Sequence, residues 1–183
     1  MIDTKYGEAP EIHIVRYIKR AEVRKIFAER ANKIDEFVDI AINAEEKLNI
    51  SEALKYYYWS LLLLQSHPDG ATITKNIKGK NQNLSTWLPR TINSIFDNLE
   101  FVVTGKENEP NIIRYLFSIK YNGKQINGCE YSTFDGRNWS PIIASKNGVG
   151  FAEVADINSK SISKIKVMIE YEFGDEWKQN KQI

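Results

Sequence analysis

Apolar residues recur at helical spacing throughout the first half of the chain. From Pro10 to Ala31 they return at mixed intervals of a helical turn, which predicts an amphipathic helix that begins at the proline. A second stripe, from Ile34 to Ala44, predicts a second helix. A third helix is expected over residues 52–65, where Ser51 is placed to be its N-cap and His67-Pro68-Asp69-Gly70 to end it.

The third predicted helix is apolar on nearly every side. Between Leu54 and Leu64 almost every residue is aromatic or aliphatic. Such a helix must be covered all round, by other helices, by a sheet or by a partner. We predict that core packing covers most of it. The tyrosine hydroxyls tolerate a boundary with water, so Tyr56, Tyr58 and Trp59 are the candidate binding surface on this helix.

A polar stretch separates the third helix from a fourth. Residues 71–84 are mostly Lys, Asn, Gln and Thr, which predicts a loop or a short hairpin. Ser85 is then expected to cap a short helix that has Pro89 in its first turn. The apolar residues from Trp87 to Leu99 give this helix a buried face, and we expect it to close the helical half.

From Phe101 onward the apolar period changes to two. Apolar and polar residues alternate over residues 115–121 and again over residues 165–173, which predicts half-buried strands. Asn-Gly and Asp-Gly pairs that begin at positions 122, 127, 135 and 147 predict tight turns between strands. The predicted fold is therefore a segregated α+β protein, with a helical bundle over residues 1–98 and an antiparallel β-sandwich over residues 99–183.

Residues 37–68 resemble one tetratricopeptide repeat. The positions that match its pattern of aromatic, aliphatic and small residues are Phe37, Ile40, Ala41, Ala53, Tyr57 and Ser60. The segment departs from the family at Ala44, where a tyrosine is usual, and its proline comes three residues late. No second copy follows at a fixed period. The resemblance implies a closely packed helical hairpin, and peptide binding only by analogy.

The β half is similar to bacterial Ig-like and carboxypeptidase-regulatory-like modules. Residues 117–126 match the strand that leads through an Asn-Gly turn, and residues 146–151 match a later turn before an apolar strand. Gln125 replaces the usual proline. The resemblance implies an Ig-like sandwich that serves as a spacer or interaction domain. Together with the helical hairpin, it looks like an envelope-associated protein of Bacteroidetes type.

Composition excludes several partners. The 183 residues include 25 basic and 24 acidic side chains, a net charge of +1, so no global field attracts nucleic acid or an anionic membrane. Basic residues gather between Ile12 and Ile34, which we interpret as a solvated face, with contact to an anionic partner as the alternative. The apolar run Leu61–Leu64 is far shorter than the roughly 20 residues needed to cross a bilayer. We expect no nucleic-acid partner and no transmembrane segment.

The compartment stays open. The first residues lack the basic-then-apolar order of a signal peptide and any lipidated cysteine. The chain is therefore expected to be either cytoplasmic or a piece of a longer exported precursor, and in the second case periplasmic or in the cell envelope.

The residues that carry most enzyme chemistry are few. A single cysteine, Cys129, rules out an internal disulfide and a thiolate metal cluster, and we expect it to be a buried, inert thiol. His13 and His67 are the two histidines, so no metal site is predicted. Asp135 begins an acidic turn that we interpret as a side-chain-capped hairpin turn rather than half of a calcium loop. No catalytic residue and no cofactor is predicted.

The expected function is that of a non-enzymatic interaction or structural module. Its partner would be another protein or other domains of a longer chain. The alternative is a carbohydrate-binding module with Trp139 and Tyr131 as a stacking platform, and the third class is a hydrolase with scattered carboxylates. Trp139 follows the acidic turn, so it either plugs the end of the core, which we favour, or stands out for stacking.

Overall fold

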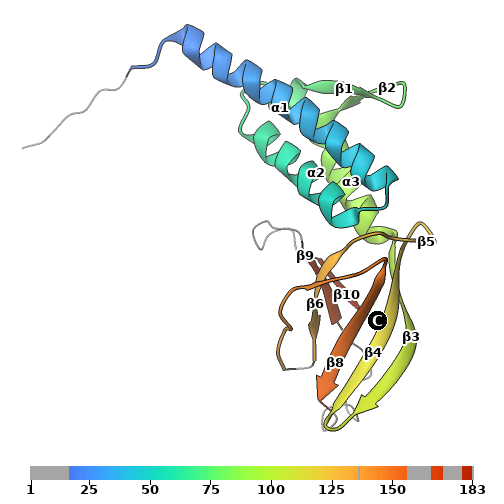
Figure 1. Cartoon of the computed structure of the whole chain (residues 1–183). Helices are drawn as coiled ribbons and strands as arrows, with labels where there is room; N and C mark the ends of the chain where they lie inside the picture. Colours follow the sequence, from blue (N-terminus) through green and yellow to red (C-terminus); the bar gives the residue numbers. More distant parts are fainter. Residues whose placement is uncertain (1–16, 136, 156–165, 171–178, 183) are drawn as a thin grey trace, which may run out of the picture.

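The computed structural model describes residues 17–135, 137–155, 166–170 and 179–182. Helices come first in the described chain and antiparallel sheets follow them, so the predicted α+β class is confirmed (Figure 1). The helical part consists of α1 (Arg20–Glu46), α2 (Ile50–Gln65), the 3-10 helix η1 (Gly70–Thr72), the hairpin β1 (Thr74–Ile77) and β2 (Lys80–Asn83), and α3 (Leu84–Asp97).

The first two predicted helices are one continuous helix. α1 runs unbroken from Arg20 to Glu46, across the expected boundary near Ala31. Neither glycine nor proline occurs at that boundary, and Asn32 and Lys33 cost a helix well under 1 kcal/mol each. The prediction of a break was therefore wrong. Residues 17–19 are not helical, so α1 begins later than predicted, and the part of the prediction from Pro10 to residue 16 lies outside the described residues.

α2 is covered by helices on two sides, as its apolar composition predicts. It packs against α1 and α3 (Figure 1), and its buried side chains include Leu54, Tyr57, Tyr58 and Leu61. Small residues let the first two helices approach closely. Ala41 of α1 and Ser60 of α2 are both fully buried, and the Ser60 hydroxyl donates a 2.8 Å hydrogen bond to the Tyr56 carbonyl.

The hairpin between α2 and α3 is anchored to α1. Lys75 of β1 forms ion pairs with Asp35 and Asp39 of α1, and its side chain is only 11% exposed. Burial alone would lower the pKa of Lys75, but hydrogen bonds to the two carboxylates outweigh it and raise the pKa. The hairpin that was one of the two predicted alternatives for residues 71–84 is thus present and fixed.

α3 begins earlier than predicted. Its N-cap is Asn83, whose side-chain oxygen accepts a 3.0 Å hydrogen bond from the backbone nitrogen of Ser85 and a 2.6 Å bond from its hydroxyl. Ser85 is therefore inside the helix rather than at its cap, and Pro89 lies in the second turn. Asparagine is as good a cap as serine, so the local pattern alone did not decide between them.

Two antiparallel sheets make up the second half. One has the order β3-β4-β5, with β8 also paired to β4, and the other has the order β10-β9-β6-β7. The strands are β3 (Leu99–Glu109), β4 (Ile112–Tyr121), β5 (Lys124–Gln125), β6 (Glu130–Phe134), β7 (Ile143–Ala144), β8 (Val149–Ala155), β9 (Lys166–Glu170) and β10 (Gln179–Gln182). Both sheets are open. The sandwich, its Ig-like identity and the domain boundary after residue 98 stay predictions.

Two of the predicted turns form as expected and one does not. Asn122-Gly123 and Asn147-Gly148 have positive φ at both residues, as a tight turn between antiparallel strands requires. The pair Asn127-Gly128 instead lies in the segment that passes from β5 in one sheet to β6 in the other. The turn predicted at Asp135 includes position 136, which lies outside the described residues, as do residues 165 and 171–173 of the last predicted strand.

The two sheets contact each other through Tyr131 of β6. Its ring centroid lies 5.3 Å from that of Phe117 in β4. Its hydroxyl accepts a 2.8 Å hydrogen bond from the Phe151 backbone nitrogen and donates a 3.1 Å bond to the Phe151 carbonyl of β8. Gly150 leaves the room for this contact, because a Cβ there would lie 2.5 Å from the Phe117 ring and 2.7 Å from the Tyr131 hydroxyl.

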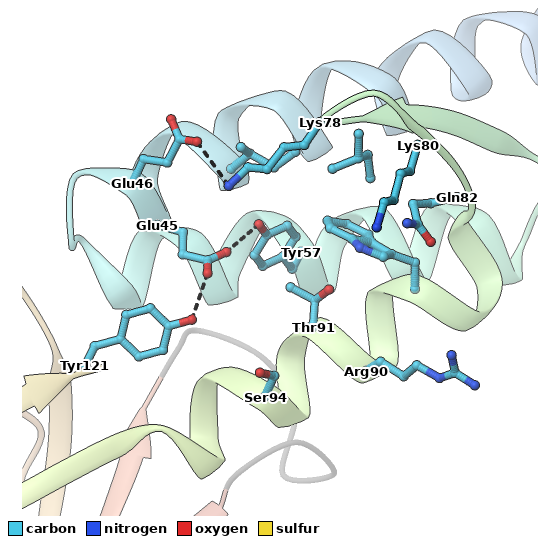
Figure 2. Close-up of a pocket in the computed structure, with 13 residues that line it drawn as sticks. Glu45, Glu46, Tyr57, Lys78, Lys80, Gln82, Arg90, Thr91, Ser94 and Tyr121 are labelled. Carbon is cyan, nitrogen blue, oxygen red and sulfur yellow. Dashed lines mark hydrogen bonds and ion pairs between the residues drawn. The ribbon is translucent and has the colours of Figure 1, made fainter. Parts of the chain in front are cut away.

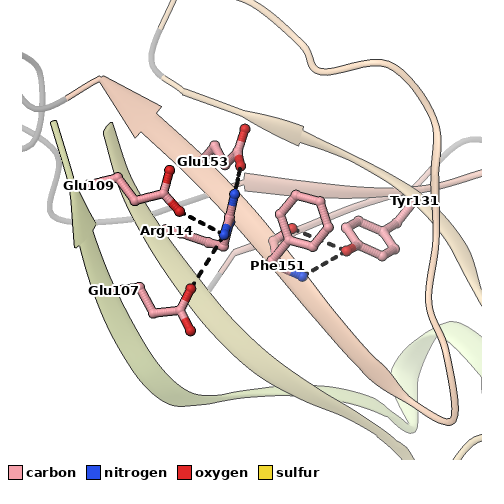
Figure 3. A network of polar contacts seen from close by, with 6 residues as sticks. All are labelled: Glu107, Glu109, Arg114, Tyr131, Phe151 and Glu153. Carbon is pink, nitrogen blue, oxygen red and sulfur yellow. Dashed lines mark hydrogen bonds and ion pairs between the residues drawn. The ribbon is translucent and has the colours of Figure 1, made fainter. Parts of the chain in front are cut away.

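Arg114 forms ion pairs across the outer face of the sheet that contains β3, β4 and β8. Arg114 of β4 lies directly opposite Glu107 of β3 and Glu153 of β8 (Figure 3). Its guanidinium is 2.7 Å from Glu153, 2.9 Å from Glu109 and 3.4 Å from Glu107. The network therefore links all three long strands of this sheet on the side away from Tyr131.

The α1–α2 turn joins the helical half to the sheets. The Asn127 backbone nitrogen donates to the Leu48 carbonyl at 2.8 Å, and the Ile50 nitrogen donates to the Gly128 carbonyl at 3.1 Å. The Ser51 hydroxyl accepts a 2.7 Å hydrogen bond from the Glu130 nitrogen. The prediction that Ser51 caps α2 was wrong, because its hydroxyl is used in this long-range contact.

We predict that Gly150→Ala lowers the free energy of unfolding by about 1–3 kcal/mol, because the new methyl group must displace the Phe117 ring or the Tyr131 hydroxyl. Gly105→Ala is the matched control, since its Cβ would lie 3.5 Å from Leu116, an ordinary contact. Urea denaturation followed by tryptophan fluorescence measures both. Equal stability of the two variants would contradict the packing described here.

Candidate functional site

A groove of about 680 Å³ opens where both halves of the chain meet (Figure 2). Its walls come from the end of α1, from α2, from the β1–β2 hairpin, from α3 and from the end of β4. The side chains that line it are Ile42, Glu45, Glu46, Tyr57, Ile77, Lys78, Lys80, Gln82, Trp87, Arg90, Thr91, Ser94 and Tyr121. The groove thus depends on the helices, the hairpin and the sheet at once.

Aromatic and aliphatic side chains provide its apolar surface. Trp87 of α3 is half-buried, and its ring centroid lies 5.6 Å from that of Tyr57 in an edge-to-face arrangement. Ile77, at the end of β1, is buried beside them, and Ile42 of α1 is half-buried. The groove therefore offers a partly exposed indole on a well-packed base.

A single carboxylate holds three elements together at one end of the groove. Glu45, in the last turn of α1, accepts a 2.7 Å hydrogen bond from the Tyr57 hydroxyl of α2 and another 2.7 Å bond from the Tyr121 hydroxyl of β4 (Figure 2). A negative charge is unfavourable at the C-terminal end of a helix. The two hydroxyl donors offset that cost, because hydrogen bonds to charged groups contribute about 1.5–3 kcal/mol each.

Both tyrosines are held in the protonated form. Burial, followed by the charge of the nearby Glu45 carboxylate and the hydrogen bond to it, raises the pKa of Tyr57 far above its ordinary value. Burial and the hydrogen bond to Glu45 raise the pKa of Tyr121 as well. At neutral pH both hydroxyls are therefore donors, as the geometry at Glu45 requires.

Three cations line the rim. Lys78 lies 3.4 Å from Glu46, and both side chains are largely exposed. Lys80 of β2 and Arg90 of α3 are exposed and come from opposite walls. Among the described residues, neither of these two forms an ion pair.

The candidate surface predicted on α2 lies outside this groove. Tyr56 and Trp59 are half-buried, and their rings form a cluster with Phe37 of α1 at centroid distances of 5.3–5.5 Å. Lys33 lies over the Phe37 ring and Lys55 over the Trp59 ring. We call the rings of Phe37, Tyr56 and Trp59 the outer aromatic cluster. Tyr58, the third predicted residue on α2, is only 5% exposed.

The platform predicted on the β half is not present as a pair of exposed rings. Tyr131 is fully buried between the sheets, so its face is not accessible to a ligand. Trp139 is 40% exposed and its ring lies 5.3 Å from that of Phe134. The ring is therefore neither a buried plug nor free of the sheet.

Three of the remaining residues that the sequence analysis considered, Cys129, Asp135 and His67, are described and have contacts within the fold. Cys129 is buried, as predicted, and burial raises the pKa of its thiol to about 12. The Asp135 carboxylate accepts hydrogen bonds from the backbone nitrogens of Arg137 and Asn138, which lower its pKa. His67 contacts the Phe27 ring edge-to-face, and His13 lies outside the described residues.

Neither a metal cluster nor a spanning helix is found in the described part of the chain. No three His, Cys, Asp or Glu side chains there come together to hold a metal ion. None of the described helices is long and apolar enough to cross a membrane.

The sequence analysis missed the groove itself. Glu45 and Tyr121 are 76 positions apart, and no local pattern indicates that they meet. Trp87 was assigned to a buried helix face, and the lysines of the hairpin to a polar connector. One signal was available: an acidic pair at the end of a helix, Glu45-Glu46, without a basic residue in the last turn.

The fold and the groove define the chain by its structure, as an α+β protein with a ligand-sized groove among its helices and the β1–β2 hairpin, bounded at one end by Tyr121 of β4. No protein-family model matches the sequence, and no curated protein or solved structure is significantly similar to it. The function therefore has to be argued from the groove.

We predict that Glu45→Gln lowers the free energy of unfolding by about 1–2 kcal/mol. The amide keeps one acceptor oxygen, but its nitrogen cannot accept from the second tyrosine hydroxyl, and the hydrogen bonds lose their charge. Relief at the helix end, about 0.5 kcal/mol, offsets only part of this. The control is Glu46→Gln, which removes an exposed ion pair worth less than about 1 kcal/mol. Equal effects in urea denaturation would contradict a special role for Glu45.

The free energy of unfolding is expected to fall above pH 10 because of Tyr57. A raised pKa in the folded state means that the folded chain keeps a proton that the unfolded chain loses above its pKa of about 10. The stabilisation is complete below pH 10 and declines above it, by up to about 1.4 kcal/mol per pH unit for Tyr57. Urea denaturation from pH 8 to 11 should show a smaller decline in Tyr57→Phe. Glu45→Gln should keep most of the decline in the free energy of unfolding, because burial is the largest cause of the raised pKa of Tyr57. If Tyr57→Phe lost stability with pH as steeply as the parent chain does, the prediction would be refuted.

Proposed function

We propose that this chain is a non-enzymatic interaction module that binds an extended segment of a partner protein in the groove. The observation that carries the proposal is a concave site with an aromatic base and a charged rim, walled by elements of both halves. Its volume of about 680 Å³ falls within the range of about 300–1,000 Å³ typical of ligand sites, enough for several side chains.

The residues in the groove are of the types that dominate protein interfaces. Tryptophan, tyrosine and arginine are enriched among the side chains that carry most of the binding energy. Trp87 and Arg90 come from the same helix, three positions apart and so on one face, and both line the groove. A partner side chain that packs on the Trp87 ring would displace water from both surfaces. Because the Trp87 ring already packs on Tyr57, little side-chain entropy would be lost on binding.

The resemblances support the same class of function. Close packing at Ala41 and Ser60 is what a tetratricopeptide-like hairpin requires, and two antiparallel sheets in contact through Tyr131 suit an Ig-like module. Ig-like modules serve as spacers or interaction domains, and the helical hairpin suggests peptide binding by analogy. On this proposal the chain is part of an exported bacterial cell-envelope protein, and its partner is another protein or a further domain of a longer chain.

Carbohydrate binding is the second candidate, and a single observation favours it. Trp139 is 40% exposed beside Phe134, so an aromatic face near β6 is open to a sugar. With Tyr131 buried, this face is one ring wide rather than a platform. A glycan array probed with the chain and with Trp139→Ala tests it: binding that depends on Trp139 would favour this candidate over the groove.

The groove proposal predicts that peptides selected against the purified chain bind through Trp87. A library of random 12-residue peptides displayed on phage supplies the probes, and fluorescence polarisation measures the binding of the enriched sequences. Trp87→Ala should weaken binding at least tenfold, because the indole is the main apolar contact. Thr91→Phe, which fills the groove without removing a packed ring, should weaken it similarly. Melting temperatures confirm that both variants are folded.

Trp59→Ala is the matched control, because it removes a half-exposed tryptophan from the outer aromatic cluster and leaves the groove intact. It should bind the peptides as the parent chain does. Loss of binding in Trp59→Ala with full binding in Trp87→Ala would move the site to the outer aromatic cluster. Failure of the library to yield any binder tighter than about 100 μM would overturn the proposal.

A further inference from the structure

The charges of the groove are divided between its two ends. Glu45, Tyr121 and Glu46 with its partner Lys78 lie at one end, and Lys80, Gln82 and Arg90 lie at the other (Figure 2). The groove is therefore polarised along its length, although its formal charges nearly cancel.

Two of the three helices that wall the groove reinforce this polarity. α1 ends at Glu46, so the negative end of its dipole adds to the acidic end of the groove. α3 begins at Leu84, and Trp87 is in its first turn, so the positive end of its dipole adds to the basic end. Fixed backbone dipoles and side-chain charges thus have the same direction.

The acids of the groove are already engaged, whereas two of its cations are not. Glu45 accepts hydrogen bonds from two tyrosines, and Glu46 pairs with Lys78. Within the described part of the chain, Lys80 and Arg90 have no carboxylate partner. The charge that remains for a ligand is therefore positive and lies beside Trp87.

We propose that the groove recognises an acidic segment, in which one or two Asp or Glu side chains bind between Lys80 and Arg90. A neighbouring apolar side chain of that segment packs on Trp87, and the Gln82 amide, which both donates and accepts, bonds its backbone. Lys80 is on β2 and Arg90 on α3, and both side chains are exposed; Arg90 extends away from the groove in Figure 2 and turns toward Lys80 when a carboxylate binds between them. Arginine suits this role because its guanidinium binds a carboxylate in a bidentate manner.

The same features favour an acidic peptide over a nucleic acid. Single-stranded nucleic acids bind where a continuous basic track accompanies several stacking rings. The groove has one half-exposed indole and two unpaired cations at one end, and its other end is acidic. The inference rests on the proposed function, since it names the chemistry of the segment that the same groove would bind.

The test uses the peptides that the phage selection against the whole chain yields. Their enriched sequences should contain Asp or Glu next to an aromatic or branched side chain. Conversion of these acids to Asn or Gln should weaken binding at least tenfold in fluorescence polarisation at 50 mM salt, and 300 mM salt should weaken the acidic form several-fold through screening. An oligothymidylate is added as a competitor, and it should not displace the peptide.

Charge reversal in the groove gives the decisive comparison. The double variant Lys80→Glu/Arg90→Glu should bind the acidic peptide at least tenfold more weakly than the parent chain does. It should gain affinity for the same peptide with Lys in place of the acids. Its control, Arg137→Glu/Lys146→Glu, changes the net charge equally at exposed positions outside the groove and should keep the parent preference. Rescue by the Lys peptide excludes a loss of folding as the cause.

The outcomes separate the two proposals. Peptides that bind through Trp87 without a preference for acids would overturn this inference and leave the proposed function standing. A preference for acids that survives in Lys80→Glu/Arg90→Glu would place the anion elsewhere and also overturn it. Displacement of the peptide by oligothymidylate would favour a nucleic acid as the ligand. A selection that yields no binder would overturn both.

Discussion

The hydrogen bonds that the Glu45 carboxylate accepts are the constraint on which the arrangement of the two halves depends. One carboxylate oxygen accepts from Tyr57 of α2 and the other from Tyr121 of β4, so three elements from distant parts of the chain are fixed at one point. The acid lies where the α1 dipole opposes it, and the two hydroxyl bonds, worth more than about 3 kcal/mol together, outweigh a dipole cost of about 0.5 kcal/mol. The Glu45 carboxylate thus fixes the positions of the Tyr57 and Tyr121 hydroxyls at the base of the groove.

The α1–α2 turn extends the same constraint into the backbone. Leu48 has a φ of 61°, a left-handed conformation that costs a residue with a side chain roughly 1 kcal/mol and that glycine usually occupies after a helix. In return its side chain packs against the core and its carbonyl accepts from Asn127 at the start of the crossing to β6. Together with the Ser51–Glu130 bond, this makes the junction between helices and sheets a set of specific contacts rather than a flexible linker.

The types and order of the elements were largely predictable from the sequence, but their boundaries were not, and the errors have more than one physical cause. Periodicity indicated the helices of the first half and the strands of the second, and the Asn-Gly pairs at 122 and 147 marked real turns. The caps were misplaced because Ser51 is used by Glu130, a partner 79 positions away, and because Asn83 competes with Ser85 on equal terms. The groove could not be predicted, since its lining comes from six helices and strands that only the tertiary fold brings together.

On the proposed function, stability and recognition depend on different charges of the groove. The negative charge of Glu45 is needed to hold α1, α2 and β4 in place, so a ligand cation that competed for it would loosen the site that binds it. Lys80 and Arg90 stabilise nothing in the described structure through ion pairs, and a ligand anion that engages them leaves the fold untouched. Such a division explains why a groove with acids and bases of nearly equal number would still select one sign of charge: the acids are structural, and the free cations remain for the partner.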